Sequence, residues 1–282
     1  MITHPISDSI SPPPVAHYEN FPVASWLLPS HLRGPVRLIY AFARQADDFA
    51  DEGVEAPETR LARLAEFGRE LDAIECGSSS NSPLFQQLGP MIRTHALPIG
   101  LFRELLSAFE QDVTKTRYAD FGEVMDYCRR SANPVGRLLL HLYRETELRS
   151  LACSDGICSA LQLINFLQDI PIDYAKGRIY MPADEMRRFG IDQADLAASN
   201  TNPNWKPFMH FQIERARNML LAGAPLGRVL TGRIGLELRM IVRGGERILE
   251  KLYASGGDVF ARRPVLHKRD WVTMFARAVV KR

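Results

Sequence analysis

The sequence predicts an all-α protein, and three observations support this fold class. Apolar residues recur at steps of three or four through most of the 282-residue chain, as on the buried face of a helix. The alternation expected of strands is almost absent. Breaks between helical segments are short, and no repeat of solenoid length occurs. We therefore expect one helical domain over residues 17–282, preceded by a flexible arm, rich in Pro and Ser, over residues 1–16.

The predicted helices follow one another along the chain. They are expected over residues 40–51, 60–75, 100–113, 154–176, 203–222, 225–252 and 269–280. Ser154 or Asp155 is the candidate N-cap of the fourth helix, and Gly177 is its expected end. The breaks are rich in Gly, Ser, Asn and Pro, which favour turns. Each break is followed at once by a new helical segment, so none is expected to be a domain linker.

Composition excludes several classes of function. A formal net charge of +2 gives no strong field for nucleic acid. The four cysteines form no C-x-x-C pair, which favours reduced thiols in a cytosolic protein. The N-terminus lacks the pattern of a signal peptide, and no fully apolar run has the length of a membrane span. We expect a cytoplasmic protein, with peripheral contact to the inner membrane left open.

An unusual acidic motif lies in the first predicted helix. Asp47 and Asp51 are four residues apart and Asp48 lies beside them, with Arg44 one turn earlier. Like charges at this spacing destabilise a helix by a few tenths of a kcal/mol per pair. The surrounding Tyr, Phe and Ala residues indicate that part of this helix is buried or faces a cleft. A solvated acidic face is the plainer interpretation of such a motif taken alone.

A second acidic motif lies in the segment NFLQDIPID. Asn165, Asp169 and Asp173 recur at steps of four, with Gln162 nearby on the same helix. Pro171 lies between the two aspartates and removes one backbone donor, so we expect a kink or local unwinding there.

Two clusters of oxygen ligands on separate apolar helices predict a site for a hard cation. Mg²⁺ binds one or two carboxylates together with waters and phosphate oxygens, and Mn²⁺ is the alternative ion. Facing clusters would hold metal ions against a diphosphate, and Arg44, Lys176 and Arg178 would add positive charge to that anion site. Zinc-ligand spacing, a nucleophile elbow, a dinucleotide fingerprint and a Walker loop are all missing. We expect no nucleotide cofactor, but the missing fingerprint is weak support for this, because such a cofactor can also bind without one.

Three segments give the chain a family resemblance. YAFARQADDFAD, YCRRSANPVG and NFLQDIPIDYAKGRIYMP occur in the order found in squalene/phytoene synthases, which the chain resembles from about His17 to Arg277. This likeness implies an isoprenoid synthase-type helical bundle around a central apolar cavity. It also implies that the substrate is an isoprenoid diphosphate.

The resemblance also implies roles for individual residues. Asp47, Asp48 and Asp51 match the first metal-binding motif. The second motif is matched by Asn165, Asp169 and Asp173. Diphosphate or substrate contacts would come from His17, Arg44, Gln162, Lys176, Arg178 and Tyr180. Tyr127 and Gly136 match a kinked helix within the cavity, although Tyr127 and Tyr180 taken alone are more typical of core tyrosines.

Further segments favour one branch of the family. HYENFPVASWLLP, RRSANPVGRLLL and VFARRPVLHKRDW, together with the second acidic motif and KGRIYMP, resemble the bacterial hydroxysqualene synthases of hopanoid pathways. The implied reaction is Mg²⁺-dependent conversion of presqualene diphosphate to hydroxysqualene, between a presqualene diphosphate synthase and a downstream reductase. Alternatives are presqualene diphosphate, squalene or phytoene synthesis, or a non-catalytic family member that binds lipid or a partner protein.

The segment SANPVG distinguishes this chain from the more usual Ala-Gly-Thr-Val-Gly type. Pro134 inside an apolar helix is expected to free a carbonyl and bend the axis. Asn133 could satisfy that backbone group, or it could hold a water in an otherwise apolar cavity. We leave both roles of Asn133 open.

Overall fold

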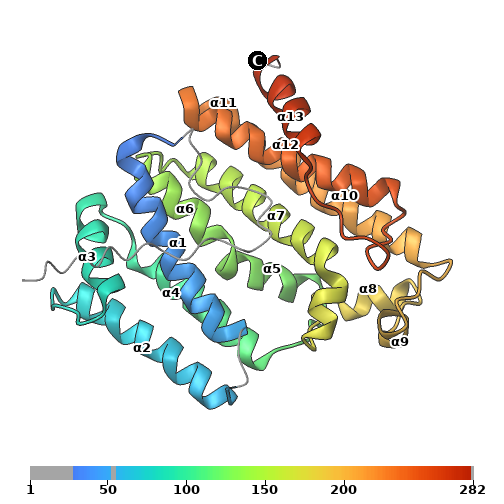
Figure 1. Cartoon of the computed structure of the whole chain (residues 1–282), viewed down its shortest axis with the longest axis horizontal. Coiled ribbons are helices and arrows are strands. Elements are labelled where there is room, and N and C mark those ends of the chain that lie inside the picture. Colours follow the sequence, from blue (N-terminus) through green and yellow to red (C-terminus); the bar gives the residue numbers. More distant parts are fainter. Residues whose placement is uncertain (1–27, 52–54, 281–282) are drawn as a thin grey trace, which may run out of the picture.

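The computed structural model describes residues 28–51 and 55–280, and the regular elements of this part are helices (Figure 1). They are α1 Ser30–Asp51, α2 Pro57–Glu75, α3 Pro83–His95, α4 Ile99–Thr114, α5 Phe121–Ser131, α6 Asn133–Leu142, α7 Leu148–Ala175, α8 Ala183–Arg188, α9 Gln193–Ala197, α10 Trp205–Gly223, α11 Leu226–Val229, α12 Gly232–Ala254 and α13 Lys268–Val280. The prediction of an all-α fold is confirmed. The arm over residues 1–16 and His17 lie outside the described residues.

Two large apolar clusters form most of the interior of the described chain. One is built by α1 to α4 with α6, and T-shaped contacts of Phe42 with Phe85 and Phe102 lie at its centre. The larger cluster is built by α5, α7 and the helices that follow as far as α12. Helices α4 and α6 contribute side chains to both clusters. Ala46 and Ala50, beside the acidic motif of α1, belong to the first cluster.

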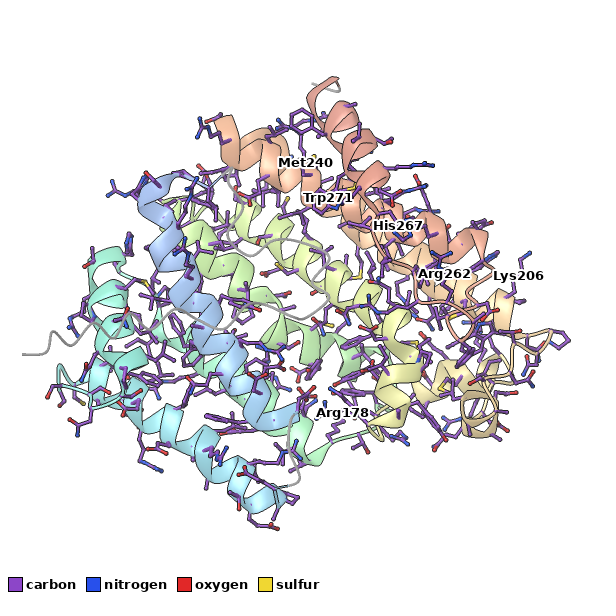
Figure 2. All side chains as sticks on the ribbon, viewed as in Figure 1. Arg178, Lys206, Met240, Arg262, His267 and Trp271 are labelled. Atoms are coloured by element: carbon purple, nitrogen blue, oxygen red, sulfur yellow. The ribbon has the colours of Figure 1, made fainter. Side chains whose placement is uncertain are left out.

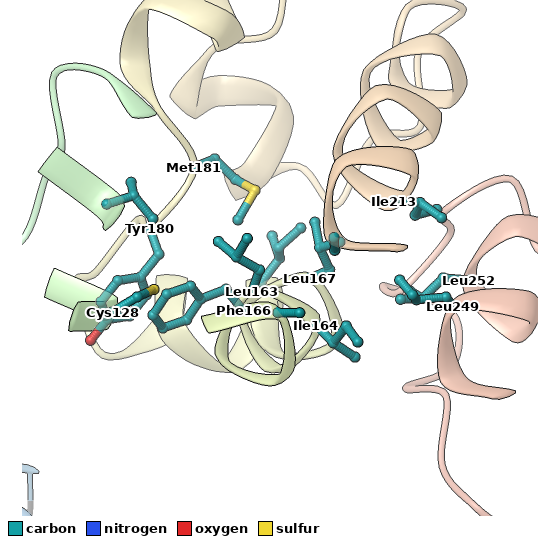
Figure 3. Packing of buried hydrophobic residues seen from close by; sticks show 14 of the residues in the cluster. Cys128, Leu163, Ile164, Phe166, Leu167, Tyr180, Met181, Ile213, Leu249 and Leu252 are labelled. Carbon is teal, nitrogen blue, oxygen red and sulfur yellow. The ribbon is translucent and has the colours of Figure 1, made fainter. Parts of the chain in front are cut away.

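Helix α7 is the central element of the larger cluster. It packs against α5, α6, α10 and α12, and Figure 3 shows its Leu163, Ile164, Phe166 and Leu167 among side chains of neighbouring elements. By length and composition α7 could cross a membrane, alone among the helices of the described residues. Half of its most apolar stretch is buried inside the protein, which is typical of a core helix.

The N-terminus of α7 differs from the prediction. The helix begins at Leu148, so Ser154 and Asp155 lie inside it and neither is an N-cap. Ser154 is buried where α6 and α7 approach closely, since a Cβ on Gly136 would lie only 2.4 Å from its hydroxyl. Asp155 binds Arg137 of α6 at 2.6 Å. The predicted local unwinding at Pro171 is also wrong, because α7 stays helical to Ala175.

Two further helices are divided where the sequence predicted continuity. Pro134 does not interrupt a continuous helix: α5 ends at Ser131, and Pro134 is in the first turn of α6, where no hydrogen-bonding N–H is needed. The helix expected over residues 225–252 is divided into α11 and α12. Leu230 is extended and Gly232 has a left-handed φ of 67°, which interrupts the helical hydrogen bonds between them.

Candidate active site

The first acidic motif contacts the segment that follows the second. The Arg178 guanidinium binds one oxygen of Asp51, and the Lys176 ammonium lies 3.2 Å from the other. Burial alone would raise the pKa of Asp51, but these two cations outweigh it and hold the pKa below its usual value. The structure thus brings together two predicted cations and one predicted metal ligand.

Backbone contacts hold the Lys176–Tyr180 segment in place. Gly177 follows α7 with a left-handed φ of 78° and turns the chain away from the helix axis. Ile179 then donates its N–H to the Thr116 carbonyl at 3.0 Å, and Arg117 donates to the Gly177 carbonyl at 2.6 Å. This pairing directs the Arg178 side chain toward the end of α1.

A buried carboxyl group that sequence reasoning missed lies behind Arg178. The Asp112 carboxylate accepts hydrogen bonds from Tyr127 at 2.6 Å and from Tyr180 at 3.0 Å. Arg178 donates to the Asp112 carbonyl at 3.0 Å. Burial raises the pKa of Asp112 to about 6, and it raises that of Tyr127 well above its usual value. Asp112 could have been found in the sequence, because it continues the apolar stripe of α4 after Leu105 and Phe109.

The two tyrosines that bind this carboxyl group belong to a cluster of four aromatic rings. Phe166 and Tyr180 are stacked with their centroids 3.9 Å apart, and Tyr127 lies 5.5 Å from Tyr180 and 6.0 Å from Phe166. Tyr118 completes the group through a stacked contact with Tyr180. A small cavity of about 10 Å³ is lined by Phe166, Tyr180 and Asp173, among others. An apolar, aromatic surface therefore adjoins the acidic residues.

The remaining residues of the first motif are paired within α1. Arg44 lies 2.7 Å from Asp48 and 3.4 Å from Asp47. Asp47 keeps 36% of its side-chain surface exposed, yet burial, followed by the charge of Asp51, raises its pKa to about 7. Arg44 offsets only part of the repulsion within the motif.

The second motif has a cationic partner that sequence reasoning also missed. Asn165 donates to Asp169 at 2.6 Å, and the Arg263 guanidinium binds both oxygens of Asp169. Asp173, one turn further on, has a pKa raised to about 8 by burial and by the charge of Asp169. Arg263 comes from the loop before α13, and no spacing in the sequence connects it to α7.

Three predicted residues are not brought into this network by the described contacts. Asn133 lies at the start of α6, where it accepts a hydrogen bond of 2.8 Å from the Ser159 hydroxyl. Gln162 lies half-buried on α7, two positions after the buried Ala160. His17 lies outside the described residues, so the structure gives it no place.

The oxygen ligands fit the chemistry of Mg²⁺, although they are not gathered around one point. In the described part of the chain, no three His, Cys, Asp or Glu side chains are arranged to hold a metal ion. Asp51 and Asp169 are instead neutralised by Arg and Lys. Asp47 and Asp173 carry the raised pKa values, partly because of neighbouring carboxylates. A divalent cation would favour the ionised form of both, and the donors are carboxylate and amide oxygens only.

Comparisons with known proteins identify the family of the chain. The squalene/phytoene synthase family profile matches residues 15–270. A hydroxysqualene synthase of Zymomonas mobilis is 35% identical over 83% of this chain and 78% of its own length. A phytoene synthase of Mycobacterium tuberculosis is 34% identical over 73% of this chain and 68% of its own.

A solved structure supports the same relationship. The squalene synthase HpnC of Alicyclobacillus acidocaldarius superposes with a TM-score of 0.78 and 34% identity, over 85% of this chain and 90% of its own. The family match covers both acidic motifs, the aromatic group and the Lys176–Tyr180 segment. The chain belongs to the squalene/phytoene synthase family.

Proposed function

We propose that this protein converts presqualene diphosphate to hydroxysqualene in a Mg²⁺-dependent reaction. The observation that carries the proposal is the pairing of Asp51 with Lys176 and Arg178. It places cations that can bind diphosphate beside a carboxylate that can bind a metal ion. The likeness to a hydroxysqualene synthase over 83% of the chain supports this product.

The protein's own residues have distinct tasks in this reaction. Arg178, Lys176 and Arg44 would bind the diphosphate oxygens and stabilise them as the carbon–oxygen bond breaks and its electron pair leaves with the diphosphate. Mg²⁺, or Mn²⁺, held by Asp47, Asp48, Asp51, Asn165, Asp169 and Asp173 would supply further positive charge to the leaving group. The cyclopropylcarbinyl cation that remains would rearrange beside the aromatic rings of Tyr127, Phe166 and Tyr180.

Water capture completes the proposed reaction. The oxygen of one water forms a bond to the cationic carbon and releases a proton, so the products are an alcohol and diphosphate. No hydride donor is required. We propose Asn133 as the residue that orders this water, since it is a buried amide next to apolar helix surface.

Phytoene or squalene synthesis is the second candidate. Similarity to a phytoene synthase at 34% identity supports it, because the same family chemistry can join two prenyl diphosphates. The intact acidic motifs argue against a non-catalytic role in binding lipid or protein. Such a protein would have no reason to keep six oxygen ligands suited to a metal ion together with opposed cations.

One assay separates these candidates. The purified full-length protein is incubated with Mg²⁺ and either presqualene diphosphate, farnesyl diphosphate or geranylgeranyl diphosphate, with and without NADPH, and the products are identified. We expect hydroxysqualene from presqualene diphosphate at a rate that NADPH does not change, with label from isotopic water in the hydroxyl. Squalene formed only with NADPH, or phytoene from geranylgeranyl diphosphate, would promote the second candidate.

The proposed reaction also implies one enzyme that acts before it and one that acts after it. An enzyme that makes presqualene diphosphate must supply the substrate, and a reductase would consume the allylic alcohol. We propose that the protein works in the cytoplasm, at the surface of the inner membrane.

A further inference from the structure

Helix α13 lies at the end of the region that the family shares. The family match ends at residue 270, so most of α13 lies beyond it. Its inner face packs through Met274 and Ala278 against Met240 of α12. At its first turn the buried Asp270 binds Arg247 at 2.8 Å and also binds Lys251. These contacts fix the orientation of α13 on α12.

The outer face of α13 exposes apolar side chains. Val272 is 73% exposed and Phe275 is 44% exposed. They lie three residues apart and therefore on the same face of the helix. Figure 1 shows α13, in red, on the outside of the molecule against α12, where nothing in the described chain covers it from beyond.

Exposed cations lie in the first turn of α13 and in the loop before it. Arg262, Lys268 and Arg269 are exposed, and none of them has a carboxylate partner within residues 28–51 and 55–280. Figure 2 shows Arg262, His267 and Trp271 along the edge that α13 and its preceding loop form. The single acid of α13, Asp270, is buried and neutralised, so the exposed face of this helix is cationic and apolar.

We propose that this face binds the surface of an anionic lipid bilayer. We call it the α13 edge, and it consists of Arg262, Lys268, Arg269, Val272 and Phe275. An interfacial helix inserts a few apolar side chains at the headgroup boundary while its cations contact anionic lipids. Charge complementarity therefore identifies the partner as a negatively charged membrane.

The size of the α13 edge favours a bilayer over a protein partner. A stable protein interface buries about 800 Å² on each side and has a well-packed apolar centre. Two exposed apolar side chains flanked by flexible Lys and Arg are too few for such a centre. They suffice for reversible membrane binding, because each juxtamembrane cation contributes on its own.

The α13 edge is also connected to the candidate active site. The loop before α13 carries Arg263, which binds Asp169, and Pro264, whose carbonyl accepts a hydrogen bond of 2.6 Å from Gln168. Membrane binding at α13 would place this loop next to the lipid surface. The binding itself does not depend on the reaction proposed above, so its test needs no substrate.

Co-sedimentation with vesicles tests the proposal on the full-length protein. Vesicles of phosphatidylglycerol and phosphatidylcholine should bind the protein at low salt, whereas vesicles of phosphatidylcholine alone should bind it weakly. The double variant Lys268→Gln/Arg269→Gln should bind the anionic vesicles about 25-fold more weakly, at about five-fold per cation. The double variant Val272→Ser/Phe275→Ser should bind the anionic vesicles at least about ten-fold more weakly than the unchanged protein.

A matched control lies at the start of α7. Leu148 is 85% exposed and Arg149 is exposed beside it, so Leu148→Ser/Arg149→Gln removes the same kinds of side chain elsewhere. This variant should bind vesicles like the unchanged protein, and all variants should keep their helical circular dichroism. Absence of binding to anionic vesicles, or equal losses in the control and α13 variants, would overturn the proposal. Self-association through Val272 and Phe275 without vesicles would instead identify a second copy as the partner and would also overturn it.

Discussion

The Lys176 ammonium lies 3.2 Å from the Asp51 carboxylate, although 125 residues separate the two in the sequence. This contact joins the end of α1 to the segment after α7, and Arg178 strengthens it from a more buried position. These two cations offset part of the negative charge that the acidic motifs bring together. The first two predictions follow from this contact.

Mg²⁺ should stabilise the protein through the two acidic motifs. A ligand that binds only the folded state raises the free energy of unfolding by about 2.7 kcal/mol at 100 times its Kd. We expect the thermal midpoint to rise with Mg²⁺ in the unchanged protein, and to rise much less in Asp51→Asn and Asp173→Asn. Turnover should fall roughly 100-fold or more in both variants.

The matched control for these variants is Asp72→Asn, which removes an exposed carboxylate of α2 that pairs with Arg103. It should keep the full response to Mg²⁺. If Asp51→Asn and Asp173→Asn also keep the response and the turnover, the assignment of the metal site is wrong.

Lys176 should contribute to diphosphate binding more than to stability. Its side chain is 46% exposed, and exposed ion pairs contribute about 1 kcal/mol or less. Lys176→Ala should therefore leave the free energy of unfolding nearly unchanged while it weakens inhibition by free pyrophosphate about ten-fold, a charge-assisted contact being worth about 1.5 kcal/mol.

Arg103→Ala serves as the control for Lys176→Ala, since Arg103 is an exposed, ion-paired cation of α4. It should change neither stability nor pyrophosphate affinity by much. Equal pyrophosphate affinity in Lys176→Ala and the unchanged protein would show that Lys176 is only a structural partner of Asp51.

Periodicity predicted the helices because their apolar faces are regular, but it could not predict contacts between distant segments. The start of α7 was misplaced because Ser154 and Asp155 have the chemistry of caps, while the helix in fact begins at Leu148 and Ser154 packs against Gly136 of α6. Pro134 was misread because a proline in an apolar segment can equally begin a helix.

The candidate site shows the same limit. The residues of the two acidic motifs were identified because all members of each motif lie on one helix, where their spacing indicates that they share a face. Arg263 was missed because only the folded chain brings its loop to Asp169. Asp112 was missed although a charged residue on an apolar stripe is a signal for a buried, hydrogen-bonded group.

Asp112 should make stability depend on pH. Its pKa is about 6 in the folded protein and about 3.8 when unfolded, so the folded state binds the proton more tightly. The contribution of Asp112 to the free energy of unfolding is fully present below about pH 4 and is lost as the pH rises through about 6. The difference between these two pKa values corresponds to roughly 3 kcal/mol in the free energy of unfolding. Asp112 is only 4% exposed, so this carboxyl group is shielded from solvent in the folded protein.

The measurement compares the unchanged protein with Asp112→Asn by urea unfolding at pH 4 and pH 7. Other groups titrate in both proteins, so they cancel in the difference. The free energy of unfolding of the unchanged protein should fall relative to that of Asp112→Asn as the pH rises. Parallel pH profiles would mean that the Asp112 carboxyl titrates normally.

Asn133 should control the ratio of alcohol to hydrocarbon among the products. If its amide orders the capturing water, Asn133→Leu should lower hydroxysqualene several-fold relative to products of proton loss. Leucine also leaves the buried Ser159 hydroxyl without its acceptor, at a cost of about 1–3 kcal/mol in stability. Product analysis should therefore be made at a temperature where the variant is folded.

Ser159→Ala separates the two effects of Asn133. It removes the same 2.8 Å hydrogen bond but keeps the amide that would hold the water. We expect Ser159→Ala to change the product ratio much less than Asn133→Leu does. Equal ratios in Asn133→Leu and the unchanged protein would remove this role of Asn133 while leaving the reaction itself in place. A similar shift in both variants would show that the position of the amide, held by Ser159, is what directs water to the cation.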